Sequence, residues 1–341
     1  MRLAVLAFAL LAASAAQARE YSRLVVFGDS YSDSGASHAI SNRLVEEGVP
    51  GAELVPGPQF WEGRWSNGPT AVEVLGSHLN LELENHAVGG ALSGEGNANP
   101  ALDTFSDTGM LGQIRTFMKG HEHLDPEALY VLYASANDFL VVPSWPSEQT
   151  VRSAADRAVA NQLQAIDELE RKGARHVLLV GPIDLSRIPM VIQAGHAQEA
   201  ALVRDRVNGA LNRALEERGN RTILYFDSVA FSVPIMASPR RYGFNNVTQA
   251  CIGRTPGGEN VICRQPDTHY FYDEVHPTAR VHKLTGEALA EAVRGWRRYI
   301  RRTFSARPFI RPLLSRFSAS CATSRFTATN AWKSKIAILP T

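Results

Sequence analysis

The sequence predicts an α/β fold in which helices cover both faces of a parallel β-sheet. Short apolar runs alternate along the chain with longer segments that have the 3.6-residue apolar spacing of amphipathic helices. Two of the helical segments end at a glycine, Gly173 or Gly219, as helix C-termini commonly do. Strands that alternate with helices indicate parallel pairing, and ligand sites in such sheets form at the carboxyl ends of the strands.

The expected elements follow from these runs in chain order. Strands are expected at residues 24–27, 81–84, 129–134, 176–180 and 222–226. Helices are expected at residues 69–79, 148–172, 198–218 and 277–300, and the first of them begins with a proline, which suits a helix N-terminus. We expect residues 34–68 and 89–108 to be long insertions, and we find no internal repeat.

The first 18 residues have the pattern of a secretory signal peptide. Arg2 precedes an apolar stretch over residues 3–13, and Ala16-Gln17-Ala18 forms an A-x-A cleavage site. A membrane anchor needs about 20 apolar residues, more than this segment offers. We therefore expect cleavage after Ala18, a secreted or periplasmic protein, and no transmembrane segment.

The composition changes sharply near residue 301. Residues 301–341 include eight basic residues and no acidic one, whereas the rest of the chain has an acidic excess. Such a shift marks a boundary, so we expect one main domain over residues 19–300 and a basic, poorly ordered tail over residues 301–341. A tail that binds weakly to anionic surfaces, and a tail read out of frame, are the alternatives. The acidic body lacks a basic stripe interleaved with aromatic residues, which argues against nucleic-acid binding.

Two of the three cysteines are candidates for a disulfide. Cys251 and Cys263 flank a loop rich in glycine and proline, and exported proteins form disulfides in oxidising compartments. A zinc site is the rival interpretation, but neither a C-x-x-C spacing nor a nearby pair of histidines supports it. Cys321 is left over.

Four short polar segments lie at the ends of expected strands or just before the last helix. GDS (28–30), NHAVGGA (85–91) and SAND (135–138) follow the first three strands, and YDEVHP (272–277) precedes the helix. Neighbouring parallel strands end at one edge of the sheet, so the first three segments should meet there. A right-handed last crossover would bring the fourth to the same edge. Each segment alone fits a turn or a helix cap, but their combined order and placement indicate a site.

Together the four segments contain the groups that acyl transfer through a serine requires. The Ser30 hydroxyl needs a base to take its proton, and His276 can serve. Asp273 can fix the imidazole tautomer. The Ser30 backbone, a glycine of NHAVGGA and the Asn137 side chain can donate hydrogen bonds to the oxyanion. The chain contains no G-x-S-x-G elbow, which argues against the α/β-hydrolase fold.

The amino-acid sequences of these segments resemble those of the GDSL, or SGNH, hydrolases. They are most similar to the branch of secreted lipases, esterases and lecithinase-haemolysin-like acyl hydrolases. The resemblance spans residues 23–298 and is carried by GRWSNGP (63–69), NHAVGGA, YVLYASANDFL (130–140), YGFNNVTQAC (242–251) and FYDEVHPTAR (271–280). It implies a three-layer, flavodoxin-like α/β sandwich, an SGNH hydrolase domain over residues 19–300, and no metal or organic cofactor. It also implies the site residues: Ser30 as nucleophile, Asp273 and His276 as its triad partners, and Ser30, Gly90 (less favoured, Gly89) and Asn137 as oxyanion donors.

Two positions differ from the usual sequence motifs of the family. Tyr31 stands where leucine usually follows the nucleophile, and Ser135 stands where the third block usually opens with glycine. Neither change removes a reacting group. Serine tolerates fewer backbone conformations than glycine, and Tyr31, beside the nucleophile, is a candidate substrate-binding residue.

The sequence therefore predicts a secreted serine esterase or lipase that forms an acyl-enzyme on Ser30. Its expected substrate is an acyl ester, a lipid or an acetylated sugar. An acetylesterase that acts on decorated polysaccharide and an acyltransferase of the same fold are alternatives. A non-catalytic protein that binds surfaces through its basic tail is an alternative of a different class.

Overall fold

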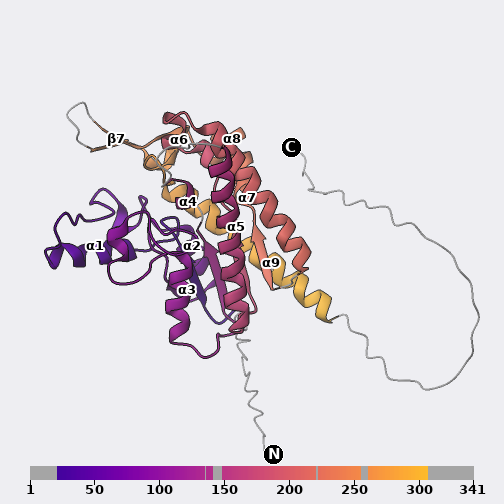
Figure 1. Ribbon diagram of the computed structural model, residues 1–341. Helices are drawn as coiled ribbons and strands as arrows, with labels where there is room; N and C mark the ends of the chain where they lie inside the picture. The colour runs from indigo at the N-terminus through magenta and orange to yellow at the C-terminus, as the bar shows by residue number, and fades with distance from the viewer. Residues whose placement is uncertain (1–20, 135, 141–147, 220–221, 255–259, 306–341) are drawn as a thin grey trace, which may run out of the picture.

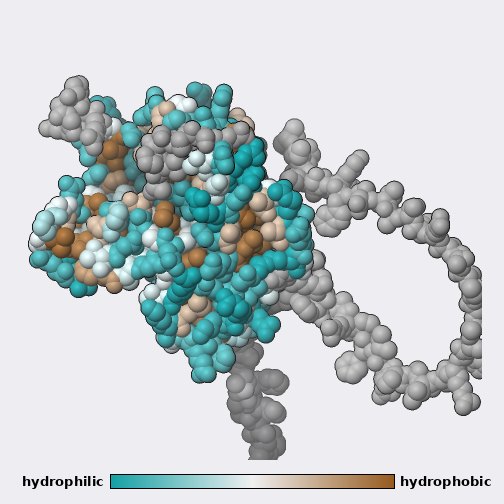
Figure 2. Space-filling view, in the orientation of Figure 1, coloured by the Kyte–Doolittle hydropathy of each residue, from teal (hydrophilic) through white to brown (hydrophobic). Residues whose placement is uncertain are grey.

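The computed structural model describes residues 21–134, 136–140, 148–219, 222–254 and 260–305. The predicted signal peptide, Ser135, Cys321 and the tail beyond residue 305 lie outside the described residues. Within the described part of the chain, no helix combines the length and the apolar character needed to cross a bilayer. Figure 2 shows a mostly hydrophilic surface in which apolar side chains gather in small areas.

A five-stranded parallel sheet forms the centre of the fold, with the strand order β2-β1-β3-β4-β5. Its strands are β1 (Leu24–Gly28), β2 (Leu83–Asn85), β3 (Leu129–Tyr133), β4 (Val177–Val180) and β5 (Ile223–Phe226). This is the flavodoxin-like order, with a topological switch point between β1 and β3. The predicted parallel sheet is confirmed, and β2 begins two residues later than the apolar run suggested.

Alternate residues of β1 point into opposite helix layers. Val25 and Phe27 pack with α3, α5 and α7, whereas Leu24 and Val26 pack with α2 and α9. These helices are α2 (Ala71–Leu79), α3 (Met110–Lys119), α5 (Glu148–Arg171), α7 (Ala197–Arg218) and α9 (Ala279–Ser305). The fold is therefore the three-layer sandwich that the resemblance implied (Figure 1).

Several short elements lie where no helix or strand was expected. The longest, α1 (Ala36–Glu46), falls in the predicted insertion at residues 34–68. It buries only Ser37, Ser41 and Leu44, so it lacks the apolar spacing of a core helix. The other elements are α4 (Asn137–Leu140), α6 (Pro189–Gln193), α8 (Ser228–Ala237), β6 (Asn246–Ala250), β7 (Ile252–Arg254), β8 (Asn260–Ile262), β9 (His269–Phe271) and the 3-10 turns η1 (Trp61–Gly63), η2 (Pro100–Asp103), η3 (Leu185–Arg187), η4 (Pro239–Tyr242) and η5 (Pro266–Thr268).

Two small sheets lie outside the central one, and the fourth polar segment directly follows the last of their strands. Strand β6 pairs in parallel with β9, and β7 pairs with β8 in an antiparallel hairpin. Cys251 directly precedes β7 and Cys263 directly follows β8, and their Sγ atoms lie 2.09 Å apart. Residues 272–278 follow β9 and lead into α9, and the Tyr272 amide donates to the His276 carbonyl across 2.7 Å. These contacts close a tight loop just before α9.

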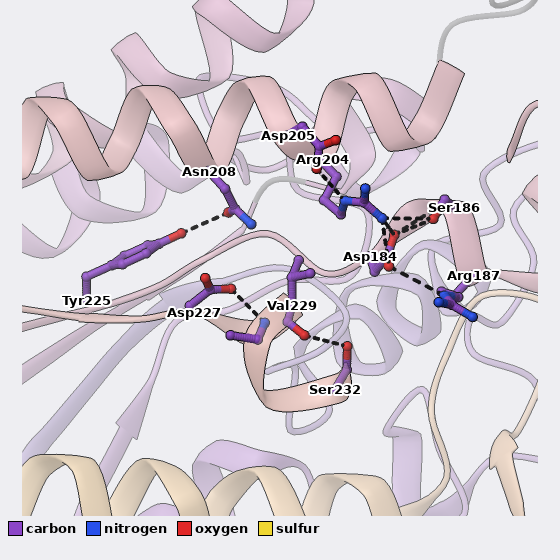
Figure 3. A network of polar contacts seen from close by, with 11 residues as sticks. Asp184, Ser186, Arg187, Arg204, Asp205, Asn208, Tyr225, Asp227, Val229 and Ser232 are labelled. Atoms are coloured by element: carbon purple, nitrogen blue, oxygen red, sulfur yellow. Dashed lines mark hydrogen bonds and ion pairs between the residues drawn. The ribbon is translucent and has the colours of Figure 1, made fainter. Parts of the chain in front are cut away.

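A polar network holds the segment that follows β4 (Figure 3). The Asp184 carboxylate accepts from the Ser186 amide at the start of η3 (3.2 Å), and it pairs with Arg204 of α7 (3.2 Å). Just beyond η3, the Met190 amide donates to the Glu274 carbonyl across 3.0 Å. The network thus ties α7 to the segment that places α6 against the loop before α9.

Candidate active site

Ser30, His276 and Asp273 form a continuous row of polar contacts. The Ser30 Oγ lies 2.9 Å from His276 Nε2, and His276 Nδ1 lies 2.7 Å from Asp273 Oδ2. An ionised carboxylate can only accept hydrogen bonds, so Nδ1 carries the proton and Nε2 is left to accept from the Ser30 hydroxyl. This is the arrangement that a nucleophile, a general base and an orienting carboxylate require.

The backbone turn that begins at Asp273 also helps to keep the Asp273 carboxylate ionised. Its Oδ1 accepts from the backbone amides of Val275 (2.8 Å) and His276 (2.5 Å). Burial by itself would raise the pKa of Asp273, but the attraction of His276 and these hydrogen bonds outweigh burial and hold the pKa below its usual value. The charged carboxylate can therefore stabilise an imidazolium at neutral pH.

The end of β1 holds Ser30 in place. A side chain at Gly28 would put its Cβ 2.6 Å from the Tyr133 carbonyl oxygen on β3, so this close approach requires glycine. The Gln113 side chain of α3 accepts from the Gly28 amide (2.9 Å) and donates to the Gly28 carbonyl (2.8 Å). Ser30 itself is 6% exposed and lines a cleft of about 480 Å³.

Gly90 lines the same cleft, in a conformation that favours glycine. Its φ is +79°, and an added Cβ would lie 2.3 Å from Asn97 Oδ1. The neighbouring Gly89 amide already donates to Asp33 (2.8 Å) and Ser37 (2.7 Å). The Gly90 amide, by contrast, has no acceptor among the described residues. The geometry therefore favours Gly90 over Gly89 as an oxyanion donor.

Asn137, the third predicted donor, also lines this cleft, at the start of α4. Its Nδ2 donates to the Ala91 carbonyl across 3.0 Å, and the amide group has a second N–H to offer. The next residue, Asp138, accepts from the Ser93 amide (2.9 Å) and hydroxyl (2.8 Å). Burial raises the pKa of Asp138, although the Ser93 hydrogen bonds oppose the rise. Asp138 thereby ties the third polar segment to the chain that follows the second.

The structure places Tyr31 away from the cleft that Ser30 lines. Its side chain is 7% exposed, and its hydroxyl donates to the Val275 carbonyl across 2.8 Å. The ring packs near His276 and His282, with centroid distances of 6.0 and 6.3 Å. Tyr31 therefore contacts the loop that carries His276, and the structure favours this role over the predicted contact with substrate.

Two further residues of the site carried no chemical signal that the sequence analysis used. Trp65 lines the cleft, with its ring centroid 5.0 Å from that of His276. Asp33 accepts from the amides of Ala36 (2.7 Å), Ser37 (3.1 Å) and Gly89 (2.8 Å), which joins the start of α1 to the second polar segment. An aspartate just before a helix is a capping signal, so Asp33 could have been found from the sequence. The role of Trp65 depends on tertiary contact alone.

A second cleft, of about 640 Å³, adjoins the cleft that contains Ser30, and the two meet at His276. The two share Trp65, Met190, Val275 and His276. We call the hollow that contains Ser30 the Ser30 cleft and the second, which contains Asp273, the His276 cleft. Together they form one groove over the Ser30–His276 contact.

Comparisons with known proteins identify the family of this chain. The family model GDSL-like Lipase/Acylhydrolase matches residues 24–289. The chain is 25% identical over 278 residues to a phosphatidylcholine-sterol acyltransferase of Aeromonas hydrophila, which covers 80% of this chain and 78% of that protein. It is 23% identical over 315 residues to a GDSL esterase/lipase of Arabidopsis thaliana (77% and 85% covered), and 24% identical over 298 residues to the thermolabile hemolysin of Vibrio parahaemolyticus (82% and 65% covered).

Solved structures are also similar to this chain. A member of the lipolytic protein G-D-S-L family from Veillonella parvula aligns with a TM-score of 0.44 at 16% identity, over 79% of this chain and 96% of that one. The family model spans most of the sequence, from the first residue of β1 into α9. The chain therefore belongs to the GDSL-like lipase/acylhydrolase family and is a carboxylic ester hydrolase.

Proposed function

We propose that this ester hydrolase acts through a Ser30–His276–Asp273 triad and an acyl-enzyme on Ser30. The observation that carries the proposal is the 2.9 Å contact between Ser30 Oγ and His276 Nε2, continued by the 2.7 Å contact from Nδ1 to Asp273. A serine hydroxyl is a poor nucleophile until a base takes its proton, and this contact supplies that base.

The reaction begins when the Ser30 oxygen attacks the ester carbonyl carbon and its proton moves to His276 Nε2. The carbonyl oxygen becomes an oxyanion, which accepts from the Ser30 and Gly90 amides and from the Asn137 side chain. The bond from carbon to the alcohol oxygen then breaks, and His276 returns its proton to that oxygen. Each oxyanion donor of this kind is worth about 10²- to 10³-fold in rate.

Deacylation repeats the sequence with water. His276 takes a proton from the water as its oxygen attacks the acyl carbon. The bond to Ser30 Oγ breaks, Ser30 regains the proton from His276, and the carboxylic acid leaves. Asp273 stays ionised throughout and stabilises the imidazolium that forms in each half-reaction.

A fluorophosphonate probe followed by peptide mass analysis tests the proposal. We expect a single adduct on Ser30, no adduct in Ser30→Ala, and much slower labelling in His276→Ala. Ser32→Ala is a matched control, because it removes a hydroxyl two residues away that is fully buried. A folded wild-type protein that stays unlabelled, or an adduct on another serine, would contradict the triad.

Acyl transfer to an alcohol is a second candidate function. It is favoured by the relative named phosphatidylcholine-sterol acyltransferase. The acyl-enzyme is the same in both reactions, and only the acceptor that attacks it differs. Product analysis in water with a long-chain alcohol present separates them, because a transferase forms the new ester and a strict hydrolase forms only the acid.

We further propose that the protein is exported, with residues 1–18 removed, a hydrolase domain over residues 19–300 and a disulfide between Cys251 and Cys263. The 2.09 Å separation of the two sulfur atoms supports the disulfide. N-terminal sequencing of the mature protein and thiol titration before and after reduction test both points. An intact N-terminus, or two titratable thiols in the unreduced domain, would contradict them. Binding of the tail to anionic surfaces stays a prediction, tested by vesicle binding after deletion of residues 301–341.

A further inference from the structure

Residues 88–91 form a tight turn beside the Ser30 cleft, which Gly89 and Gly90 line. The Ala91 amide donates to the Val88 carbonyl across 3.1 Å, which closes a four-residue β-turn. Gly90, the third residue of this turn, has a φ of +79°, whereas Gly89 has no positive φ. A positive φ at the third position alone is the mark of a type II turn.

Type I and type II turns differ in the direction of their central peptide. Conversion of one into the other turns this peptide over by about 180°, so its carbonyl and its N–H exchange sides. Here the central peptide joins Gly89 to Gly90 and includes the Gly90 N–H, the proposed oxyanion donor. That donor can therefore face the cleft in only one of the two turn types. Because both residues of the peptide are glycines, the backbone can adopt either type.

The Asn97 side chain holds the central peptide by its carbonyl. Its Nδ2 donates to the Gly89 carbonyl oxygen across 2.9 Å. Asn97 is 8% exposed and does not line the Ser30 cleft, so the Gly89 carbonyl points toward a buried group outside that cleft. The carbonyl and the N–H of a trans peptide point in opposite directions. The bond from Asn97 therefore aims the Gly90 N–H the other way, toward the cleft.

The neighbouring backbone groups of the turn also have partners. The Gly89 amide donates to the fully buried Asp33 carboxylate (2.8 Å), and the Gly90 carbonyl accepts from the Ala98 amide (2.8 Å). The Gly90 N–H, by contrast, has no acceptor among the described residues. Backbone N–H groups are strong donors that are seldom left without a partner, so a free one beside a cleft is available to a ligand.

We propose that Asn97 is a positioning residue for the oxyanion site. Its hydrogen bond to the Gly89 carbonyl keeps the turn in the type II form and so keeps the Gly90 N–H aimed at the oxyanion. Asn97 packs so closely on the turn that a Cβ added to Gly90 would lie 2.3 Å from Asn97 Oδ1, yet it lies outside the cleft and does not meet the ester. The inference rests on the proposed acyl-enzyme mechanism, because that mechanism supplies the oxyanion.

Asn97→Asp tests this role, because it keeps the size of the side chain and replaces the N–H donor with an acceptor. A carboxylate would repel the Gly89 carbonyl and attract the Gly90 N–H, which favours the type I form. We expect kcat to fall about 10²-fold with little change in KM, the effect of one lost oxyanion donor. A crystal structure of this variant should show the Gly89 carbonyl turned toward the cleft.

A thionoester separates this effect from general damage to the fold. Sulfur accepts hydrogen bonds weakly, so the ratio of kcat/KM for phenyl butyrate to that for O-phenyl thionobutyrate reports the hydrogen bonds to the oxyanion. Asn97→Asp should lower this ratio by at least about tenfold. Asn97→Ala, which removes the donor and adds no charge, should lower it about two- to tenfold. A defect in folding slows both reactions together and leaves the ratio unchanged.

Thr108→Val is the matched control. Thr108 Oγ1 is the other acceptor of Asn97 Nδ2, at 2.9 Å, and its removal leaves the bond to Gly89 in place. This variant should keep the ester-to-thionoester ratio of the wild type. An unchanged ratio in both Asn97 variants, or an equal fall in Thr108→Val, would overturn the role of Asn97 while the triad stood. If the wild type hydrolyses neither ester and takes no probe on Ser30, both the triad and the inference are wrong.

Discussion

The Tyr31 hydroxyl donates a hydrogen bond to the Val275 carbonyl oxygen across 2.8 Å, directly before His276 in the chain. Burial raises the pKa of Tyr31 well above its ordinary value, so the hydroxyl keeps its proton and remains a donor. The residue next to Ser30, the proposed nucleophile, thus holds the loop that carries His276, the proposed base. A leucine here, the usual residue of the family, could not make this bond.

Tyr31→Phe should lower kcat by about two- to tenfold and leave KM nearly unchanged, because one hydrogen bond that positions His276 is lost. Steady-state kinetics on a soluble ester measures both constants. Tyr133→Phe is the control, since its ring also packs in this buried cluster, 6.0 Å from that of Tyr31. Equal loss of kcat in both variants would mean that Tyr31 acts through general stability and not through the Val275 bond.

Asp273→Asn should reduce kcat on the order of 10³- to 10⁴-fold, because the amide no longer stabilises the imidazolium and can select the wrong tautomer. The side chain keeps its size, so the thermal midpoint should change little compared with kcat. Kinetics and thermal unfolding on the same preparation check this. A loss of less than tenfold would exclude Asp273 as the orienting carboxylate.

Asn137→Ala should lower kcat about 10²- to 10³-fold, the effect of losing one oxyanion donor. Labelling of Ser30 by a fluorophosphonate should persist at a reduced rate, because the nucleophile and base are unchanged. The time course of labelling separates this result from a loss of folding. Complete loss of labelling in a folded protein would show that Asn137 does more than donate one hydrogen bond.

Gly90→Ala should destabilise the protein and abolish activity, because its Cβ would meet Asn97 Oδ1 at 2.3 Å. Gly51→Ala is a matched control: Gly51 has a φ of +76°, close to the +79° of Gly90, and no atom lies within 4 Å of the added Cβ. The control should lose about 1 kcal/mol of stability from its backbone conformation and keep full activity. Urea unfolding and ester hydrolysis of both variants separate backbone strain from the clash in the site.

Stability should fall as the pH falls from about 6.5 toward about 3, in part because of His282. This side chain is 2% exposed, and burial, together with the charge of His276, lowers its pKa to about 3. Below pH 6.5 the unfolded chain binds a proton at His282 that the folded chain excludes, so unfolding becomes easier. The effect of one such group is at most about 1.4 kcal/mol per pH unit.

His282→Gln should make this dependence shallower, since glutamine does not titrate and can still accept from the Ala71 amide, which His282 Nδ1 does across 3.2 Å. The free energy of unfolding in urea, measured for both proteins at several pH values, gives the two slopes. The values at pH 8 isolate the packing cost of the substitution. Parallel slopes below pH 6.5 would contradict a buried neutral His282.

The central sheet could be predicted because its three inner strands, β1, β3 and β4, are fully buried and read as apolar runs. The edge strands β2 and β5 are only partly buried, and β2 includes Glu84 and Asn85, which explains why its start was placed two residues too early. Helix α1 could not be recognised in this way, because two of its three buried side chains are serines. Its start depends on Asp33, whose carboxylate also reaches Gly89 in a distant segment.

The residues of the proposed triad are easier to recognise in the sequence than the residues that support them. Ser30, Asp273 and His276 carry chemistry in their side chains, so their residue types limit what they can do. Gln113 and Trp65 acquire their roles only from where the fold places them, one against the Gly28 backbone and the other against the His276 ring. Tyr31 was recognised as unusual, yet the direction of its side chain is decided by packing against β3 and α9.

Ser30 and His276, the proposed nucleophile and base, are separated by 246 positions along the chain. During synthesis, Ser30 and the strand that presents it emerge early, whereas His276 follows only after all five strands of the central sheet have been made. The contact between them can therefore form only in a chain that has been made past residue 276 and in which the loop before α9 has returned to the end of β1.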